Sequence, residues 1–242
     1  MKRPQDFQMM EEGLAMLSSA ASIDILAERN KEILAKLNAY INEIELFNHA
    51  LGLVKVASRE ELIIKHILDS LGPLHILAEL PAFAPCQALR LGDAGSGAGL
   101  PGIPLAIALP AAHITLIERM GRRAGFLRNA QAVLALPNLE VAEMELERYP
   151  PGQFDMLCFR AFHPLDKKLL RALFKRLKPT GILAAYKGRR EAIEAEMEGL
   201  TSLLGAWEAV PYQVPFLDGQ RHLLLISQPG NTQLRSAPSI QR

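Results

Sequence analysis

Glycine and proline are concentrated in one segment, RLGDAGSGAGLPG at residues 90–102. Gly95, Gly97 and Gly99 stand at alternate positions there, after a short apolar run that ends in Asp93. Glycine tolerates positive φ and has no side chain, so such a loop lets the backbone approach a ligand closely. A tight strand-to-helix connection would use the same residues, and for the loop alone both interpretations are open.

The residues after the loop discriminate among the ligands that such loops bind. A phosphate-binding Walker loop ends in Gly-Lys-Ser/Thr, and here Leu100 and Pro101 follow Gly99, which excludes it. A dinucleotide loop has its third glycine one residue later and needs free N–H groups for the pyrophosphate at the helix start. Pro101 and Pro104 each lack an N–H there, so a pyrophosphate fits poorly.

S-adenosylmethionine has no phosphate, and two acidic residues suit its other groups. Asp93, at the end of the strand-like run, can accept a hydrogen bond from the ammonium group, directly or through water. Glu118 ends the next such run, from which a carboxylate can bind two ribose hydroxyls. Each acid alone is more often a cap or a solvated charge. Together with the glycine spacing, the pair favours a methyltransferase-type site.

The elements around these residues predict an α/β protein. Residues 88–229 alternate short apolar runs with helical stretches, which indicates a Rossmann-like sheet with helices on both faces. The sheet is expected to be mostly parallel, with an antiparallel terminal strand after the Asp218-Gly219 turn. Ligands bind beyond the carboxyl ends of the strands in such sheets, where the glycine loop and Glu118 fall.

An N-terminal helical region and a short tail flank this predicted domain. Residues 1–87 are expected to be helical, because ERNKEILAKLNAYINEIELFNHA places apolar residues at spacings of three and four. Ser58 and Glu61 form a capping-box pattern at the start of a further helix. Residues 230–242 are polar and lack periodicity, and we expect a disordered tail.

The composition is typical of a globular cytoplasmic protein. Of 242 residues, 49% are hydrophobic and 22% charged. Cys86 and Cys158 suit neither a disulfide framework nor a metal site, so we expect a reducing compartment and no metal. No apolar run approaches a membrane span, and the N-terminus lacks the apolar core of a secretory signal. The net charge is +1, with the basic excess in the part that contains the glycine loop.

Several motifs in the same order resemble the bacterial glucose-inhibited-division-B type methyltransferases. The most specific is GSGAGLPGIPLAI, supported by KHILDSL before the sheet, GRRAGFLRN after Glu118, RAF, KG and LDGQRHLLLI near the end. The resemblance covers about residues 33–228. It implies a class I methyltransferase that uses S-adenosyl-L-methionine to methylate N7 of a guanine in 16S (small-subunit) ribosomal RNA. We therefore expect this RNA, within the small ribosomal subunit, as partner of a monomeric enzyme without membrane attachment.

Carried over by position, the family's cofactor contacts fall on Gly95, Leu100, the pair Leu146-Glu147 and Arg160. Leu146 would pack near the adenine, and Arg160 would end the fourth strand at the ligand edge. Combined with the residues of the loop, the expected cofactor site comprises Asp93, Gly95, Ser96, Gly97, Gly99, Leu100, Glu118, Leu146, Glu147 and Arg160.

The chain departs from the family pattern in three places. Ala94 replaces a valine, and Glu145 stands where an arginine is common just before the adenine pair. In the helical region, Phe47-Asn48 and Gly52-Leu53-Val54 replace Trp-Asn and Asn-Leu-Thr. The RNA contacts of the N-terminal region are therefore the least transferable.

The expected chemistry needs no general base, because guanine N7 has a free lone pair on the major-groove edge. Catalysis would consist mainly of aligning N7 with the methyl group and sulfur. Arg160 and Lys187 are candidates for this positioning, and no acid or base is assigned. For His66 and His222, a capping or core role is the favoured interpretation.

A rim of basic residues is expected to contact RNA phosphates around the pocket. The candidates are Arg122, Arg123, Lys187, Arg189 and Arg221. A guanine in a single-stranded or loop region is the expected target, because a base in a duplex presents N7 poorly to a closed pocket.

Three other functions stay open from the sequence. A methyltransferase could instead act on another RNA or on a small molecule, and for a small molecule we would expect a deep pocket closed by the N-terminal helices and no salt-dependent RNA binding. A nicotinamide-dependent dehydrogenase would bind NAD, which the loop prolines disfavour. A non-enzymatic ribosome-binding module would leave the pocket empty. The presence of Asp93, Gly95 and Arg160 weighs against this alternative.

Overall fold

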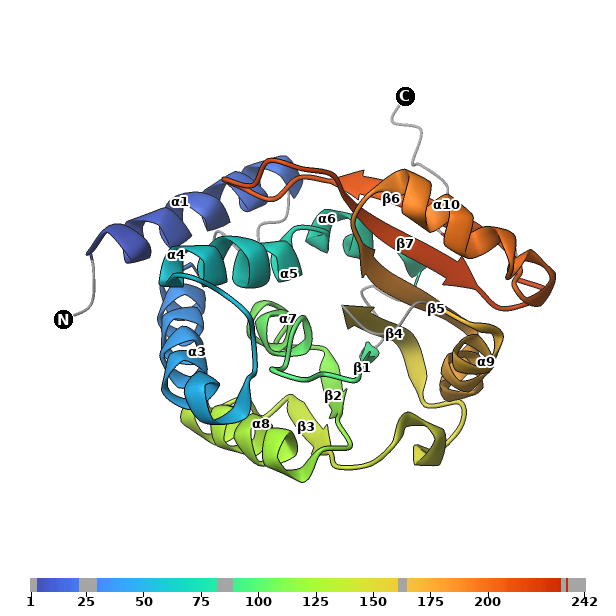
Figure 1. Ribbon diagram of the computed structural model, residues 1–242, viewed down its shortest axis with the longest axis horizontal. Coiled ribbons are helices and arrows are strands. Elements are labelled where there is room, and N and C mark those ends of the chain that lie inside the picture. The colour runs from blue at the N-terminus through green and yellow to red at the C-terminus, as the bar shows by residue number, and fades with distance from the viewer. Residues whose placement is uncertain (1–3, 22–29, 82–88, 161–164, 232–233, 235–242) are drawn as a thin grey trace.

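The computed structural model describes residues 4–21, 30–81, 89–160, 165–231 and 234. Its centre is a seven-stranded sheet in the order β3-β2-β1-β4-β5-β7-β6 (Figure 1). The strands are β1 (Arg90–Ala94), β2 (His113–Ile117), β3 (Leu139–Ala142), β4 (Phe154–Arg160), β5 (Leu177–Lys187), β6 (Trp207–Tyr212) and β7 (Arg221–Ser227).

The first five strands are parallel, and β7 runs antiparallel between β5 and β6. This confirms the predicted fold class, a mostly parallel Rossmann-like sheet with an antiparallel terminal strand. The chain leaves β1 toward β2 on one side and later returns to β4 on the other, so the order reverses between β1 and β4. Asp93 of β1 is in register with Cys158 of β4. A ligand is expected at this point, beyond the carboxyl ends of both strands.

Helices cover both faces of the sheet (Figure 1). On one side lie α7 (Gly102–Ala108) and α8 (Gly121–Val133), and on the other α9 (Lys167–Arg176) and α10 (Arg190–Glu198). Two short 3₁₀ helices follow strand β3 and helix α10, η3 (Leu146–Arg148) and η4 (Thr201–Leu203). Alternate residues of β4 enter the two cores: Cys158 faces the core that contains α7, and Leu157 the core that contains α9. A strand that is buried on both faces is expected to be apolar, and residues 156–159 in the middle of β4 are apolar and buried.

The N-terminal helices pack onto the α7 and α8 side of the sheet. They are α1 (Pro4–Ala21), α3 (Asn30–Leu51) and a continuous helix made of α4 (Arg59–Leu62), the π-helical η1 (Ile63–Leu68) and α5 (Asp69–Leu71), followed by α6 (Leu74–Ala78). The predicted cap at Ser58 is confirmed, because Ser58 Oγ accepts from Glu61 N at 3.1 Å. The Glu61 carboxylate accepts at 2.6 Å from the N–H of Ala57, one residue before the cap, so the reciprocal bond of the capping box is displaced by one residue.

These helices share a hydrophobic core with the sheet. Leu37 and Ile41 of α3 belong to the same buried cluster as Leu91 of β1 and Ile114 of β2. Tyr40, also on α3, is fully buried and donates its hydroxyl to Ala98 O at 2.5 Å, so this helix supports the glycine loop directly. The helical region expected over residues 1–87 is thus a layer of the same body.

Parts of the expected domain limits lie outside the described residues. The boundary at 87–88 and Cys86 do so, as do Ala161 and Phe162 of the RAF motif. Of the expected tail, the structure describes only Gly230, Asn231 and Leu234, and Leu234 is buried in the core. The division into three parts stays a prediction. Among the described residues, no helix is both long and apolar enough to cross a membrane.

Candidate functional site

The glycine loop between β1 and α7 adopts the conformation that its sequence predicts. Gly95, Gly97 and Gly99 have φ of 69°, 57° and 88°, a region that residues with a Cβ rarely adopt. The loop is fixed to the neighbouring strand, because the N–H groups of Gly95 and Ser96 donate to Ile117 O at 2.9 and 3.2 Å. The alternate glycines therefore allow the backbone conformation of the loop at the carboxyl edge of the sheet.

Asp93 presents a buried carboxyl group at the end of β1. Its side chain is 1% exposed, and Oδ2 accepts from Gly102 N at 3.0 Å. Oδ1 has no hydrogen-bond partner among the described residues. Burial raises the pKa of this carboxyl to about 7. An orphaned buried oxygen is costly without a partner, so the site fits a ligand that brings a cationic donor such as the ammonium of S-adenosylmethionine.

Glu118 at the end of β2 holds the loop in place. Its Oε2 accepts from Gly97 N at 3.0 Å and its Oε1 from Met120 N at 2.8 Å, with the residue 5% exposed. Each carboxylate oxygen keeps a second lone pair, so these bonds leave acceptors for ribose hydroxyls. Glu118, the residue expected to bind the ribose, thus also stabilises the glycine loop, a role that the sequence reasoning missed.

The segments after β2 and β3 line a cavity of about 380 Å³. Its lining residues are Arg119, Met120, Glu143, Met144, Glu145 and Arg148. Next to it, Leu146 is buried with Ile117 and Ala142, while Glu147 is exposed. Glu145 lies 3.9 Å from Arg148, so a guanidinium is present in this cavity although the family's usual arginine is replaced.

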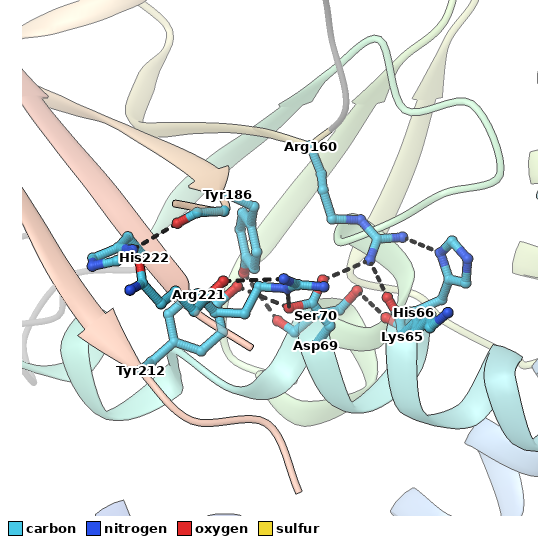
Figure 2. A network of polar contacts seen from close by, with 11 residues as sticks. Lys65, His66, Asp69, Ser70, Arg160, Tyr186, Tyr212, Arg221 and His222 are labelled. Carbon is cyan, nitrogen blue, oxygen red and sulfur yellow. Dashed lines mark hydrogen bonds and ion pairs between the residues drawn. The ribbon is translucent and has the colours of Figure 1, made fainter. Parts of the chain in front are cut away.

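Arg160, at the end of β4, is held by the N-terminal helices. Its Nη1 donates to Lys65 O and to Asp69 Oδ2, both at 3.0 Å, and its Nη2 lies 2.7 Å from His66 Nδ1 (Figure 2). The side chain is only 12% exposed. Its expected place at the ligand edge agrees with the geometry, but its partners come from a helix about ninety residues earlier in the chain.

Asp69 is the centre of this network. Besides Arg160, it accepts from Tyr212 OH at 2.9 Å and lies 3.4 Å from Arg221 Nε (Figure 2). Tyr186 of β5 donates to Ser70 O at 2.9 Å and adds a further link to the same helix. Sequence reasoning missed Asp69, Tyr186 and Tyr212. The available signal was the three-residue spacing of His66 and Asp69 in KHILDSL, which places both on one helix face.

The expected RNA-contacting residues form two groups at the carboxyl edge. Arg122 and Arg123 lie in the first turn of α8, where Arg122 is exposed and its Nη2 donates to Ala50 O at 3.3 Å. Arg189 is exposed after β5, and Arg221 begins β7 in the Asp69 network.

Two further residues expected at this edge are engaged within the protein. Lys187 Nζ lies 2.9 and 2.8 Å from the two carboxylate oxygens of Glu196 and 5.8 Å from the centre of the Phe159 ring. His222 is buried, and its Nδ1 lies 2.7 Å from Gly188 O, which agrees with its expected core role. Lys187 is therefore the least available of the expected RNA contacts.

Comparison with known proteins gives consistent matches over most of the chain. The sequence model of the family described as rRNA small subunit methyltransferase G matches residues 33–224. The ribosomal RNA small subunit methyltransferase G of Treponema pallidum (strain Nichols) is 40% identical over 233 residues, covering 95% of this chain and 97% of that protein. The enzyme of the same name from Serratia proteamaculans is 34% identical over 218 residues, covering 90% of this chain and 98% of that protein.

A solved structure supports the fold. A predicted O-methyltransferase from Agrobacterium tumefaciens superimposes with a TM-score of 0.50 at 22% identity, covering 69% of this chain and 81% of that one. At this identity the likeness concerns the fold alone.

Proposed function

This chain belongs to the rRNA small subunit methyltransferase G family, and on that premise we propose that it methylates N7 of one guanine in 16S ribosomal RNA with S-adenosyl-L-methionine as donor. The observation that carries the proposal is the buried Oδ1 of Asp93 beside the glycine loop, which finds no hydrogen-bond partner in the described part of the chain and lies where the strand order reverses. A cationic amino-acid group supplies the partner that this oxygen lacks.

The proposed cofactor site follows the carboxyl ends of the first four strands. Asp93 receives the ammonium group and Glu118 the ribose hydroxyls, while Leu146 packs against the adenine. The backbone from Gly95 to Leu100, with Ser96, Gly97 and Gly99 between them, lines the methionine side. Glu147, which is exposed next to Leu146, completes the adenine side of the proposed site, and Arg160 closes the site at the end of β4.

The cofactor supplies a methyl group activated by a positive sulfonium. With the cofactor bound, the N7 lone pair would form the new C–N bond and the electron pair of the broken C–S bond would stay on sulfur. No proton moves in this step, so the protein needs no base and acts by alignment and exclusion of water. Arg160 is the proposed positioning residue. Lys187 stabilises the edge through its pair with Glu196.

The proposed RNA contacts are arginines on either side of the site: the exposed Arg122 and the partly buried Arg123 on α8, and the exposed Arg189 after β5. Arg221 adds charge at the same edge, where Asp69 is shared with Arg160. Two guanidiniums around one carboxylate leave a net positive cluster, which suits a phosphate backbone. Recognition within the small ribosomal subunit, a monomeric state and a cytoplasmic location stay predictions.

The test is methyl transfer to small ribosomal subunits. Incubation with radiolabelled S-adenosylmethionine should place label in 16S RNA, and nuclease digestion should release it as 7-methylguanosine at a single position. Raising the salt concentration should reduce the rate steeply if the arginines contact phosphates. Folded enzyme that binds the cofactor but labels no guanine would overturn the proposal. Label in a small-molecule extract alone would favour the alternative substrate class.

A further inference from the structure

The contact between Arg160 and His66 determines which ring nitrogen of the histidine carries the proton. A guanidinium has only N–H donors, so His66 Nδ1, 2.7 Å from Arg160 Nη2, must accept. The proton of the neutral ring then lies on Nε2. Burial and the positive charge of Arg160 lower the pKa of His66 to about 4, so the ring keeps this neutral form at neutral pH.

This arrangement leaves one hydrogen-bond donor free. Nε2 has no partner among the described residues, and the ring is half-buried. It cannot act as a general base, because one nitrogen is engaged as acceptor and the other already carries a proton. His66 also lies within η1, a π-helical segment, and such segments are frequent at functional sites.

His66 lies at the edge of the sheet where a ligand is expected. Arg160 ends β4, two residues beyond Cys158, which is in register with Asp93 of β1. The ring that contacts Arg160 therefore lies at the reversal of strand order, where ligands bind. Figure 2 shows the side chain of Arg160 reaching from the end of β4 to His66 and Asp69 on the helix formed by η1 and α5.

We propose that His66 is a specificity-determining residue that donates its Nε2–H to O6 of the target guanine. O6 is the acceptor next to N7 on the major-groove edge, whereas adenine has an amino donor at that position. The Nε2–H donor can therefore form a hydrogen bond with O6 of guanine but not with the amino group of adenine. It also leaves the N7 lone pair free for the methyl group. A neutral donor also avoids placing a second full positive charge beside a purine that becomes positive during transfer.

This inference rests on the proposed function, and a substitution in the substrate separates the two. The probe is 16S RNA ligated so that the mapped target guanine is replaced by 2-aminopurine, which keeps N7 but has hydrogen at C6 in place of O6. For the wild-type enzyme we expect kcat/KM to fall by about 10- to 100-fold, the effect of one unpaired donor in a desolvated site.

The matched variant is His66→Phe, which keeps a planar ring and removes the donor. Its kcat/KM with the guanine substrate should fall by a similar factor, and its preference for guanine over 2-aminopurine should shrink to about threefold or less. His66→Gln, whose amide can both accept from Arg160 and donate, should keep more of the preference than His66→Phe. The wild-type comparison of the two substrates needs no variant and decides the inference if His66→Phe does not fold. His49→Phe, at an exposed site on α3, should keep the wild-type preference.

The outcomes discriminate clearly. Equal rates of the wild type on both substrates would overturn the inference while leaving the proposed function intact. An unchanged guanine preference in folded His66→Phe would also overturn it and assign His66 a role through Arg160 alone. A wild type that methylates no guanine would contradict the proposed function itself.

Discussion

The carboxyl group of Asp93 is held in a place that disfavours its charge. Its pKa is about 7 in the folded protein, against 3.8 for an unperturbed aspartate, and burial is the largest cause. Between these two values the native state binds more protons than the unfolded state. The free energy of unfolding must therefore fall as the pH rises from about 4 to about 7, when no cofactor is bound.

Replacing Asp93 by Asn should remove this pH dependence. We expect the cofactor-free wild type to lose stability between about pH 5 and pH 7.5, and Asp93→Asn to lose clearly less over the same interval. Urea unfolding at a series of pH values measures both. Other titrating groups are common to the two proteins and cancel in the difference. Parallel curves would show that Asp93 is not the group responsible. Asp93→Asn should also weaken cofactor binding, measured by calorimetry, since the ammonium loses an anionic partner.

Residues of the site were predictable to different degrees from the sequence. Asp93 and Glu118 were predictable because each ends a strand, and parallel strands bring their carboxyl ends to one edge. The partners of Arg160 were not, since Asp69 is 91 residues away and nothing local relates the two. Lys187 looked available for RNA, but its pairing with Glu196 depends on how α10 packs, which the pattern of charges does not encode.

At the scale of elements, the junction between β1 and α7 requires glycine for close packing. A Cβ at Gly102 would lie 2.2 Å from Leu116 Cδ2 and 2.7 Å from Asp93 Oδ2. Both distances are shorter than a carbon atom allows, and Gly102 N also donates to Asp93. The first turn of this helix is therefore fitted to the acidic side chain that it supports.

Gly102→Ala should destabilise the protein by about 1–3 kcal/mol, as expected for overpacking in a filled core, and should weaken cofactor binding by displacing Asp93. The matched control is Gly125→Ala in α8, where an added Cβ meets nothing within 4 Å. That change should be neutral or stabilise by about 0.5–1 kcal/mol, because alanine favours the helix. Denaturant unfolding measures the change in the free energy of unfolding for both variants. Equal effects of the two substitutions would contradict this packing account.

The order and type of the elements followed well from periodicity, and their irregular parts did not. The alternating strands and helices after residue 88 and the cap at Ser58 appear as predicted. The π-helical turn η1 carries no local signal, because its residues have ordinary helical spacing. It has a tertiary basis instead, since Lys65 O bonds to Arg160 of β4.

At the scale of the whole molecule, the N-terminal helices and the sheet form one hydrophobic core. Leu37 of α3 is fully buried in the cluster that contains Leu91, Ile114 and Leu223 of the sheet. Tyr40 and Asp69 add polar links from the helices to the glycine loop and to β4. A body with one core should unfold in one cooperative transition, although the sequence alone suggested a separate helical region.

Leu37→Ala tests this through a distant probe. The chain has a single tryptophan, Trp207, which lies in β6 at the edge of the sheet. Removing the buried leucine should cost about 2–5 kcal/mol, and the tryptophan-detected transition should shift as far as the helical circular dichroism does. Leu170→Ala on α9, equally buried against the opposite face, should behave the same way. If the helices folded independently, Leu37→Ala would move the dichroism transition and leave the Trp207 transition in place, because the sheet would not depend on α3.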